Sequence, residues 1–257
     1  MKTGREKRAL SLCGSGFMGM YHLGVADSVQ RYAPHRYTDI IGASAGALVG
    51  AILASNVPAE SFVGATLQVA KDTRAQRFGC VTPGFQLTEL LRTIMEKHLP
   101  LTAHETCQSN GLHICVSGPA PRLWRQTIVS HWQSREGLIQ CLQRSSYIPL
   151  FTGPAIASWQ YLDGGIFTGN WPSLSGTKTE FSSPFAGPRF EIAPRGDTTE
   201  RQQSARIHGV YVDVSAHNLQ AAWGALVPWD EDRLQRLYER GQADARSFLS
   251  SLDSTGS

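Results

Sequence analysis

The chain has 257 residues, of which 41% are hydrophobic and 18% are charged, and its formal net charge is +3. This balance excludes an intrinsically disordered chain and predicts a folded protein with a substantial core. Four basic residues and one acidic residue among the first eight account for the positive charge, so the remaining chain is formally neutral. We expect this basic stretch to be a solvated tail. A nucleic-acid groove needs basic residues spread over a face, so no nucleic-acid partner is expected.

The cysteines and the hydropathy pattern indicate a cytoplasmic protein. Five cysteines without a CxxC pair favour buried, reduced thiols over a disulfide framework or a zinc site. No apolar run approaches 18 residues, so we expect no transmembrane segment. The apolar stretch after the N-terminal basic residues contains four glycines and His22, which argues against a secretory leader. We predict one domain over residues 8–250, disordered tails at 1–7 and 251–257, and no metal or cofactor.

The first fifty residues predict alternating strands and helices. Short apolar runs are typical of buried strands, and an apolar stripe at helical spacing precedes Pro34. A strand over 9–13 is followed by a turn over 14–19 and a helix over 18–32. A second strand over 39–41 is followed by a turn over 42–46 and a helix over 47–55. This order with tight turns is typical of a parallel βαβ unit, so the fold class is predicted to be α/β.

The rest of the chain continues the mixture of helices and strands. The periodicity predicts an amphipathic helix over 87–95, neighbouring strands over 112–117 and 124–130, and a helix capped by Ser134. A strand is expected over 208–214 and a long amphipathic helix over 234–252. The polar segment 194–206 is predicted to be a surface loop.

A G-x-S-x-G motif occupies the second predicted strand-to-helix turn. It consists of Gly42, Ser44 and Gly46 with alanines between them. A serine hydroxyl is a weak nucleophile, and a sharp elbow with flanking glycines exposes it to a base above the sheet. The following helix directs its N-terminal N–H groups at developing negative charge. The motif is frequent by chance, so a turn that only packs a helix on a sheet is the alternative.

The first turn carries a second motif with three interpretations. Gly14, Ser15, Gly16 and Gly19 form a literal G-x-G-x-x-G after a strand and before a helix. Such a loop binds the pyrophosphate of a dinucleotide when an acid closes the next strand, but Asp39 opens that strand instead. Backbone N–H groups in a glycine-rich loop also bind an oxyanion, which would make this loop the partner of Ser44. A tight turn without a ligand is the third interpretation.

Asp163 is the candidate general base. With Gly164 and Gly165 it forms a turn predicted to be open and uncrowded, from which the carboxylate could reach the serine. A Ser-Asp-His triad remains the alternative, because His208 or His217 would complete the chain order of the α/β-hydrolases. Among the other histidines, only His22 lies close to a motif.

Taken together, the three motifs resemble those of the patatin-like phospholipase family, and most closely its animal branch with adipose triglyceride lipase and its short relatives. The likeness extends over about residues 8–250. It is carried by residues 10–24, 42–46 and 163–165, with support from 78–84, 145–150 and 183–187.

The resemblance implies a three-layer α/β sandwich with a mostly parallel central sheet. It also implies a Ser44–Asp163 dyad without a catalytic histidine, and an oxyanion hole formed by the backbone of Gly14, Ser15 and Gly16. The implied reaction is hydrolysis of triacylglycerol, phospholipid or retinyl esters through an acyl-enzyme, or transfer of the acyl group. Peripheral contact with a membrane or lipid droplet is expected. A non-catalytic lipid-binding protein and a dinucleotide-dependent oxidoreductase remain the alternatives.

Overall fold

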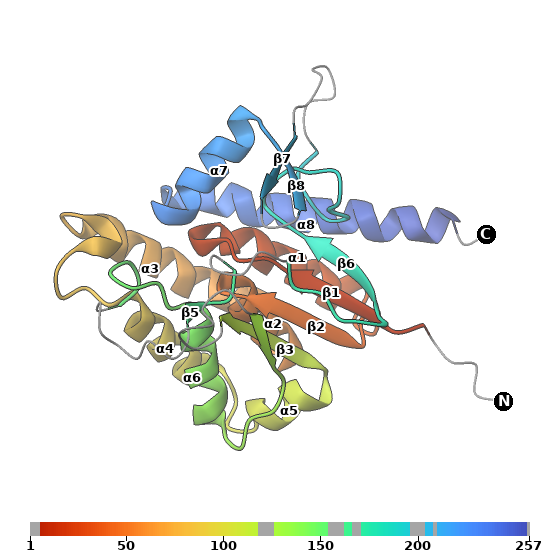
Figure 1. Cartoon of the computed structure of the whole chain (residues 1–257), viewed down its shortest axis with the longest axis horizontal. Helices are drawn as coiled ribbons and strands as arrows, with labels where there is room; N and C mark the ends of the chain where they lie inside the picture. Colours follow the sequence, from red (N-terminus) through yellow and green to blue (C-terminus); the bar gives the residue numbers. More distant parts are fainter. Residues whose placement is uncertain are drawn as a thin grey trace.

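A mostly parallel β-sheet forms the centre of the molecule (Figure 1). The computed structural model describes residues 6–117, 126–153, 162–165, 171–195, 204–207 and 210–255. The sheet order is β4-β3-β2-β1-β6, and β5 also pairs with β3. Neighbours among β1, β2, β3 and β6 are parallel, whereas β4 and β5 are antiparallel to β3. The strands are β1 (Arg8–Leu12), β2 (Asp39–Ala43), β3 (Leu112–Ser117), β4 (Gln126–Val129), β5 (Leu162–Asp163) and β6 (Lys178–Ser182).

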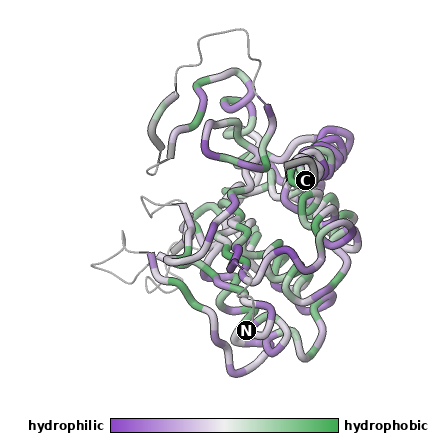
Figure 2. Tube along the Cα trace, turned by 90° about the vertical axis from the view of Figure 1, so that its right-hand side faces the viewer, coloured by the Kyte–Doolittle hydropathy of each residue, from purple (hydrophilic) through white to green (hydrophobic). Residues whose placement is uncertain are grey.

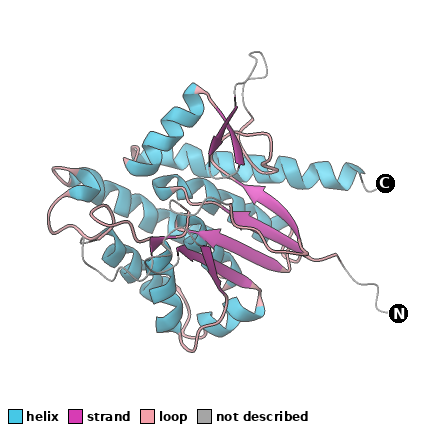
Figure 3. Ribbon diagram, in the orientation of Figure 1, coloured by secondary structure: helices cyan, strands magenta, loops and turns pink. Residues whose placement is uncertain are grey.

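Helices flank this sheet and complete the predicted three-layer α/β architecture (Figure 3). They are α1 (Gly19–Tyr32), α2 (Ala45–Ala54), α3 (Val63–Ala75), α4 (Leu87–His98), α5 (Ala103–Ser109), α6 (Arg135–Ser145), α7 (Ala216–Leu226) and α8 (Glu231–Thr255). Short 3-10 helices in the described part of the chain are η1 (Gly16–Met18), η2 (Ala59–Phe62) and η3 (Gly79–Val81). A separate antiparallel pair is formed by β7 (Ser204–Ile207) and β8 (Val210–Asp213).

The strands alternate their side chains between two packed faces. Leu10, Leu12 and Ile40 join the main core, which also contains side chains from α1, α2 and α8. The next residue along β2, Ile41, belongs to a second small cluster with Ala43 and Cys115, against which Leu174 packs. Because successive residues in a strand point to opposite faces, this division shows that the sheet is covered on both sides.

Close packing of α1 against α8 brings the last helix onto the first helix of the chain (Figure 1). A Cβ atom at Gly24 would lie 2.0 Å from the carbonyl oxygen of Tyr238, and one at Gly241 would lie 2.1 Å from that of Tyr21. Glycine at both crossing points therefore permits a backbone approach that any side chain would prevent. Within the residues that the structure describes, no helix has both the length and the apolar character needed to cross a bilayer. Figure 2 accordingly shows hydrophobic and hydrophilic positions interspersed along the trace.

Most of the predicted elements are confirmed, with small shifts at their ends. β1, α1, β2, α2, α4, β3 and α8 occur where the periodicity indicated them, and Ser134 caps α6 by accepting a hydrogen bond from the N–H of Gly137. The predicted strand over 208–214 is β8, although residues 208–209 lie outside the described residues. The predicted loop 194–206 is wrong at its end, where β7 begins at Ser204.

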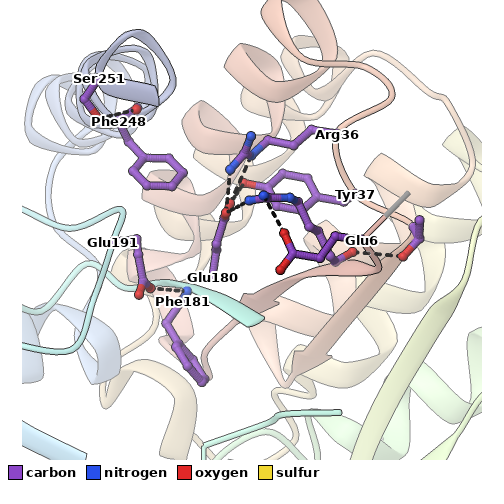
Figure 4. Close-up of polar contacts among 10 residues, drawn as sticks. Glu6, Arg36, Tyr37, Glu180, Phe181, Glu191, Phe248 and Ser251 are labelled. Carbon is purple, nitrogen blue, oxygen red and sulfur yellow. Dashed lines mark hydrogen bonds and ion pairs between the residues drawn. The ribbon is translucent and has the colours of Figure 1, made fainter. Parts of the chain in front are cut away.

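Arg8, the last residue of the basic N-terminal stretch, lies in β1 and not in a solvated tail, whereas residues 1–5 lie outside the described residues. Arg8 and Arg36 both form ion pairs with Glu180 of β6, at 3.1 Å and 2.5 Å. The hydroxyl of Tyr37 donates a hydrogen bond of 2.8 Å to the same carboxylate (Figure 4). Glu180 is only 3% exposed, and its carboxylate is compensated by ion pairs with two guanidinium groups and a hydrogen bond from a phenol. We call Arg8, Arg36, Tyr37 and Glu180 the Glu180 cluster.

Candidate active site

Ser44 lies at a strained turn between β2 and α2. Its backbone dihedrals are φ 54° and ψ −126°, a conformation that residues with a side chain rarely adopt. Both flanking glycines are required by close contacts: a Cβ atom at Gly42 would lie 2.4 Å from the carbonyl oxygen of Gly46, and one at Gly46 would lie 2.2 Å from that of Leu12. The structure therefore has the strand-to-helix elbow that the G-x-S-x-G motif predicts.

The end of α6 connects the Ser44 turn to the Asp163 turn. The hydroxyl of Ser145 accepts a hydrogen bond of 2.9 Å from the N–H of Ser44 and donates one of 2.6 Å to the carbonyl of Cys115 on β3. The carbonyl of Ser145 in turn accepts a hydrogen bond of 3.1 Å from the N–H of Gly164. One fully buried residue thus holds both candidate catalytic segments in place.

Asp163 lies on a buried turn rather than the open one that we predicted. Its side chain is 1% exposed, and a Cβ atom at Gly164 would lie 2.0 Å from the carbonyl oxygen of Cys115. The N–H of Asp163 donates a hydrogen bond of 2.8 Å to the carbonyl of Tyr147, and its Oδ1 accepts a hydrogen bond of 2.8 Å from the N–H of Gly165. The glycines are therefore needed because the turn packs tightly against β3, and these contacts fix the direction of the carboxylate.

The glycine-rich loop after β1 meets both of these turns. A Cβ atom at Gly14 would lie 3.4 Å from the Cβ of Ser44, and one at Gly165 would lie 3.4 Å from the Cα of Gly14. Among the residues that the structure describes, none accepts a hydrogen bond from the N–H of Gly14 or Ser15. Gly16 has a φ of 52°, and a Cβ atom there would lie 2.0 Å from the carbonyl oxygen of Ala225 in α7. The loop therefore packs closely against α7, and the N–H groups of Gly14 and Ser15 remain available as hydrogen-bond donors.

A large apolar cavity lies above these three segments. It has a volume of about 550 Å³, and Gly14, Ser15, Gly16, Gly19, Ser44, Asp163 and Gly165 all lie in its wall. Its remaining wall is mostly apolar and comes from α2, α3, α4 and α7, with Leu48, Val69, Leu91, Ile94 and Leu219 among the contributors. The predicted motif residues Gly42, Gly46 and Gly164 are not in the wall and instead permit the tight turns. Such a cavity suits a molecule with long hydrocarbon chains and one polar reacting group.

Neither His22 nor His217 lies in the cavity wall with Ser44. His22 is fully buried outside the cavity wall, and burial lowers its pKa to about 4, so its ring is neutral at physiological pH. The Nε2 of His217 lies 3.2 Å from the carbonyl oxygen of Pro184, and this residue is also absent from the wall. His208, the other predicted triad member, lies outside the described residues.

The dinucleotide interpretation of the first turn is not supported by the position of Asp39. That carboxylate pairs with His113 at 3.0 Å at the amino-terminal end of β2. The glycine loop lies past the opposite, carboxyl-terminal ends of the strands, where a ribose-binding acid would have to be. In the parts of the chain that are described, no group of three His, Cys, Asp or Glu residues is arranged to hold a metal ion.

Sequence reasoning did not identify several contributors to the site, among them Ser145 and α7. Ser145 was noted only as part of a stretch that resembles the family, and no local pattern distinguishes a serine that binds a distant backbone N–H. The helix α7, which covers the cavity, was not predicted, because its sequence has only a weak apolar stripe. Both contributions depend on tertiary packing.

Comparisons with known proteins identify the family to which the chain is similar. A family model described as patatin-like phospholipase matches residues 10–172. The human patatin-like phospholipase domain-containing protein 4 is 34% identical over 93% of this chain and 95% of its own length. The human patatin-like phospholipase domain-containing protein 2 is 31% identical over 95% of this chain, which spans 49% of that relative. The human 1-acylglycerol-3-phosphate O-acyltransferase PNPLA3 is 29% identical over 94% of this chain and 50% of its own length.

Proposed function

This chain belongs to the patatin-like phospholipase family, and on that basis we propose that it is a serine esterase that hydrolyses carboxylic esters of lipids. The observation that carries the proposal is the strained Ser44 in the wall of an apolar cavity that Asp163 also lines. The proposed catalytic domain covers residues 8–250. The non-catalytic lipid-binding alternative is less well supported, because strain at a buried turn is costly and persists mainly where it has a use.

In the proposed mechanism Asp163 acts as the general base. Its carboxylate takes the proton of the Ser44 hydroxyl as Oγ attacks the ester carbonyl. The tetrahedral oxyanion is stabilised by backbone N–H groups of Gly14, Ser15 and Gly16. Asp163 returns the proton to the leaving alcohol, and an acyl-enzyme remains on Ser44. Water, activated by the same carboxylate, then releases the fatty acid and restores the free hydroxyl.

The proposed substrates are triacylglycerol, phospholipid or retinyl esters. The apolar cavity favours long acyl chains, since burying each CH₂ group contributes about 0.8 kcal/mol. Acyl transfer is the second candidate reaction, because one relative is named as an acylglycerol-phosphate acyltransferase. It differs only in the last step, in which the hydroxyl of a second lipid replaces water.

An ester panel with two serine variants tests the proposed function. Purified chain is incubated with the three ester classes, with and without monoacylglycerol as an acyl acceptor, and the products are identified by mass spectrometry. Ser44→Ala is expected to lower kcat by at least about 10³-fold. Ser250→Ala on the exposed face of α8 is the matched control and should leave turnover unchanged. Full activity of folded Ser44→Ala would refute the proposal.

We also propose that the protein works in the cytoplasm in peripheral contact with a membrane or lipid droplet. All five cysteines are free and buried, as suits a reducing compartment. Leu219, Trp223 and Leu226 of α7 are 70%, 65% and 47% exposed, at spacings that place them on one face of the helix. Leu219 and Leu226 also line the cavity, so this exposed face is continuous with the cavity wall, and we propose that a lipid enters beside it.

Co-sedimentation with phosphatidylcholine vesicles and flotation with triolein droplets test this contact. Trp223→Ser, on this exposed face but outside the cavity wall, is expected to lower the bound fraction and to raise KM for an aggregated ester. Turnover of a short soluble ester should change less than twofold, because that substrate needs no surface. Unchanged binding of Trp223→Ser to both surfaces would contradict the proposed contact.

A further inference from the structure

His22 makes an unusual hydrogen bond to the peptide that begins the glycine-rich loop. Its Nε2 lies 3.1 Å from the carbonyl oxygen of Cys13, and its Nδ1 lies 3.2 Å from the hydroxyl of Ser182. A carbonyl oxygen only accepts hydrogen bonds, so Nε2 carries the proton and Nδ1 accepts from Ser182. Burial keeps the ring neutral by lowering the pKa of His22 to about 4, so this arrangement holds at physiological pH.

The carbonyl that His22 binds belongs to the same peptide group as the N–H of Gly14. In a trans peptide the C=O and N–H bonds point in opposite directions, so fixing one fixes the other. The N–H of Gly14 has no acceptor among the described residues, and Gly14 lies in the cavity wall beside Ser44. The hydrogen bond from His22 therefore fixes the direction of the Gly14 N–H, which is an available donor in the wall of the proposed site.

We propose that His22 is a positioning residue that holds the Cys13–Gly14 peptide so that the Gly14 N–H faces the oxyanion formed on Ser44. This role rests on the proposed esterase function. An oxyanion hole accelerates a reaction only if its donors are already oriented, so that no reorganisation accompanies the development of charge. Donation to the Cys13 carbonyl also polarises the amide and strengthens its N–H as a donor. His22 acts through the peptide and does not contact the substrate.

Three variants separate this role from a structural one. His22→Phe keeps a buried ring without a donor, whereas His22→Gln keeps an N–H at about the distance of Nε2. Kinetics are measured per active site, with the active fraction taken from the end point of fluorophosphonate labelling. We expect His22→Phe to lower kcat about tenfold with KM within twofold, and His22→Gln to recover most of the loss. Ser28→Ala is the matched control, since it removes a partly buried hydrogen bond from α1 to the carbonyl of Gln242 and should leave kcat per site unchanged.

Ser182→Ala keeps the test decisive if His22→Phe does not fold. Without the Ser182 hydroxyl the ring loses the donor that sets its tautomer, so kcat should fall about threefold at constant KM. Unchanged kcat per site in folded His22→Phe, or in Ser182→Ala where the first variant fails to fold, overturns the proposal while leaving the esterase function standing. Wild-type protein that hydrolyses no ester and takes no fluorophosphonate overturns both.

Discussion

The two ends of the parallel strands carry buried polar groups of opposite character. Near the amino-terminal ends, the Glu180 cluster pairs one carboxylate with two guanidinium groups and a phenol. Past the carboxyl-terminal ends, Ser44 sits in a strained conformation and the Gly14 N–H points to no acceptor among the described residues. The polar groups of the first region bond to one another, whereas the second region has a donor that is available to a ligand.

This difference indicates where stability and function are located. A buried charge with all its partners costs little while intact, but removal of one partner leaves an uncompensated charge. Strain and unused donors lower stability, and they are retained where a ligand or transition state uses them. Substitutions at the Glu180 cluster should therefore change stability, whereas substitutions around Ser44 should change turnover.

The largest expected effect is that of Asp163→Asn. An amide cannot accept the Ser44 proton, so kcat should fall about 10³-fold. The amide oxygen can still accept the N–H of Gly165, so the melting temperature should stay within a few degrees of the wild-type value. Steady-state kinetics and thermal unfolding measure both quantities. A kcat within tenfold of wild type would remove Asp163 from the mechanism.

Glu180→Gln should lower the stability of the protein and leave kcat unchanged. It leaves Arg8 and Arg36 without their carboxylate, and breaking a buried ion pair costs about 3–5 kcal/mol. Glu60→Gln, at an exposed ion pair with Arg31, is the matched control with a much smaller expected loss of stability. Urea unfolding measures these losses, and kcat per active site should be unchanged in both variants. Equal losses would refute the structural role of the cluster.

The buried His22 predicts a pH dependence of stability. Its pKa is about 4 in the folded chain, below the 6.5 of the unfolded state, so the unfolded chain binds more protons between these pH values. The resulting stability is fully present above pH 6.5 and is lost as the pH falls to about 4, by about 3 kcal/mol. Comparing the unfolding free energy of wild type and His22→Gln across this range isolates the effect. Parallel pH curves for the two proteins would contradict it.

A smaller effect than those of Asp163→Asn and Glu180→Gln is expected for Ser145→Ala. The substitution removes the acceptor of the Ser44 N–H, so the strained turn loses its support and kcat should fall about tenfold at constant KM. Ser55→Ala removes a comparable buried hydroxyl near the far end of α2 and serves as control. Kinetics per active site distinguish the two variants, and identical kcat values would show that Ser145 does not support the nucleophile.

The sequence predicted best what depends on neighbouring residues. The apolar runs of β1, β2 and β3 and the glycines of the two turns are local signals, and all of them occur where expected. β6 was not predicted, because its alternation includes Lys178 and the buried Glu180, whose partners lie more than 140 residues away in the chain. The role of Ser145 and the cover formed by α7 were not predictable for the same reason.

Fluorophosphonate labelling followed by peptide mass spectrometry tests the central claim most directly. The reagent forms a covalent bond only with a serine that is activated and supported by an oxyanion hole. We predict one modified residue, Ser44, no label in Ser44→Ala, and a strongly reduced labelling rate in Asp163→Asn. Ester turnover by folded Ser44→Ala, or a label on another serine, would contradict the account.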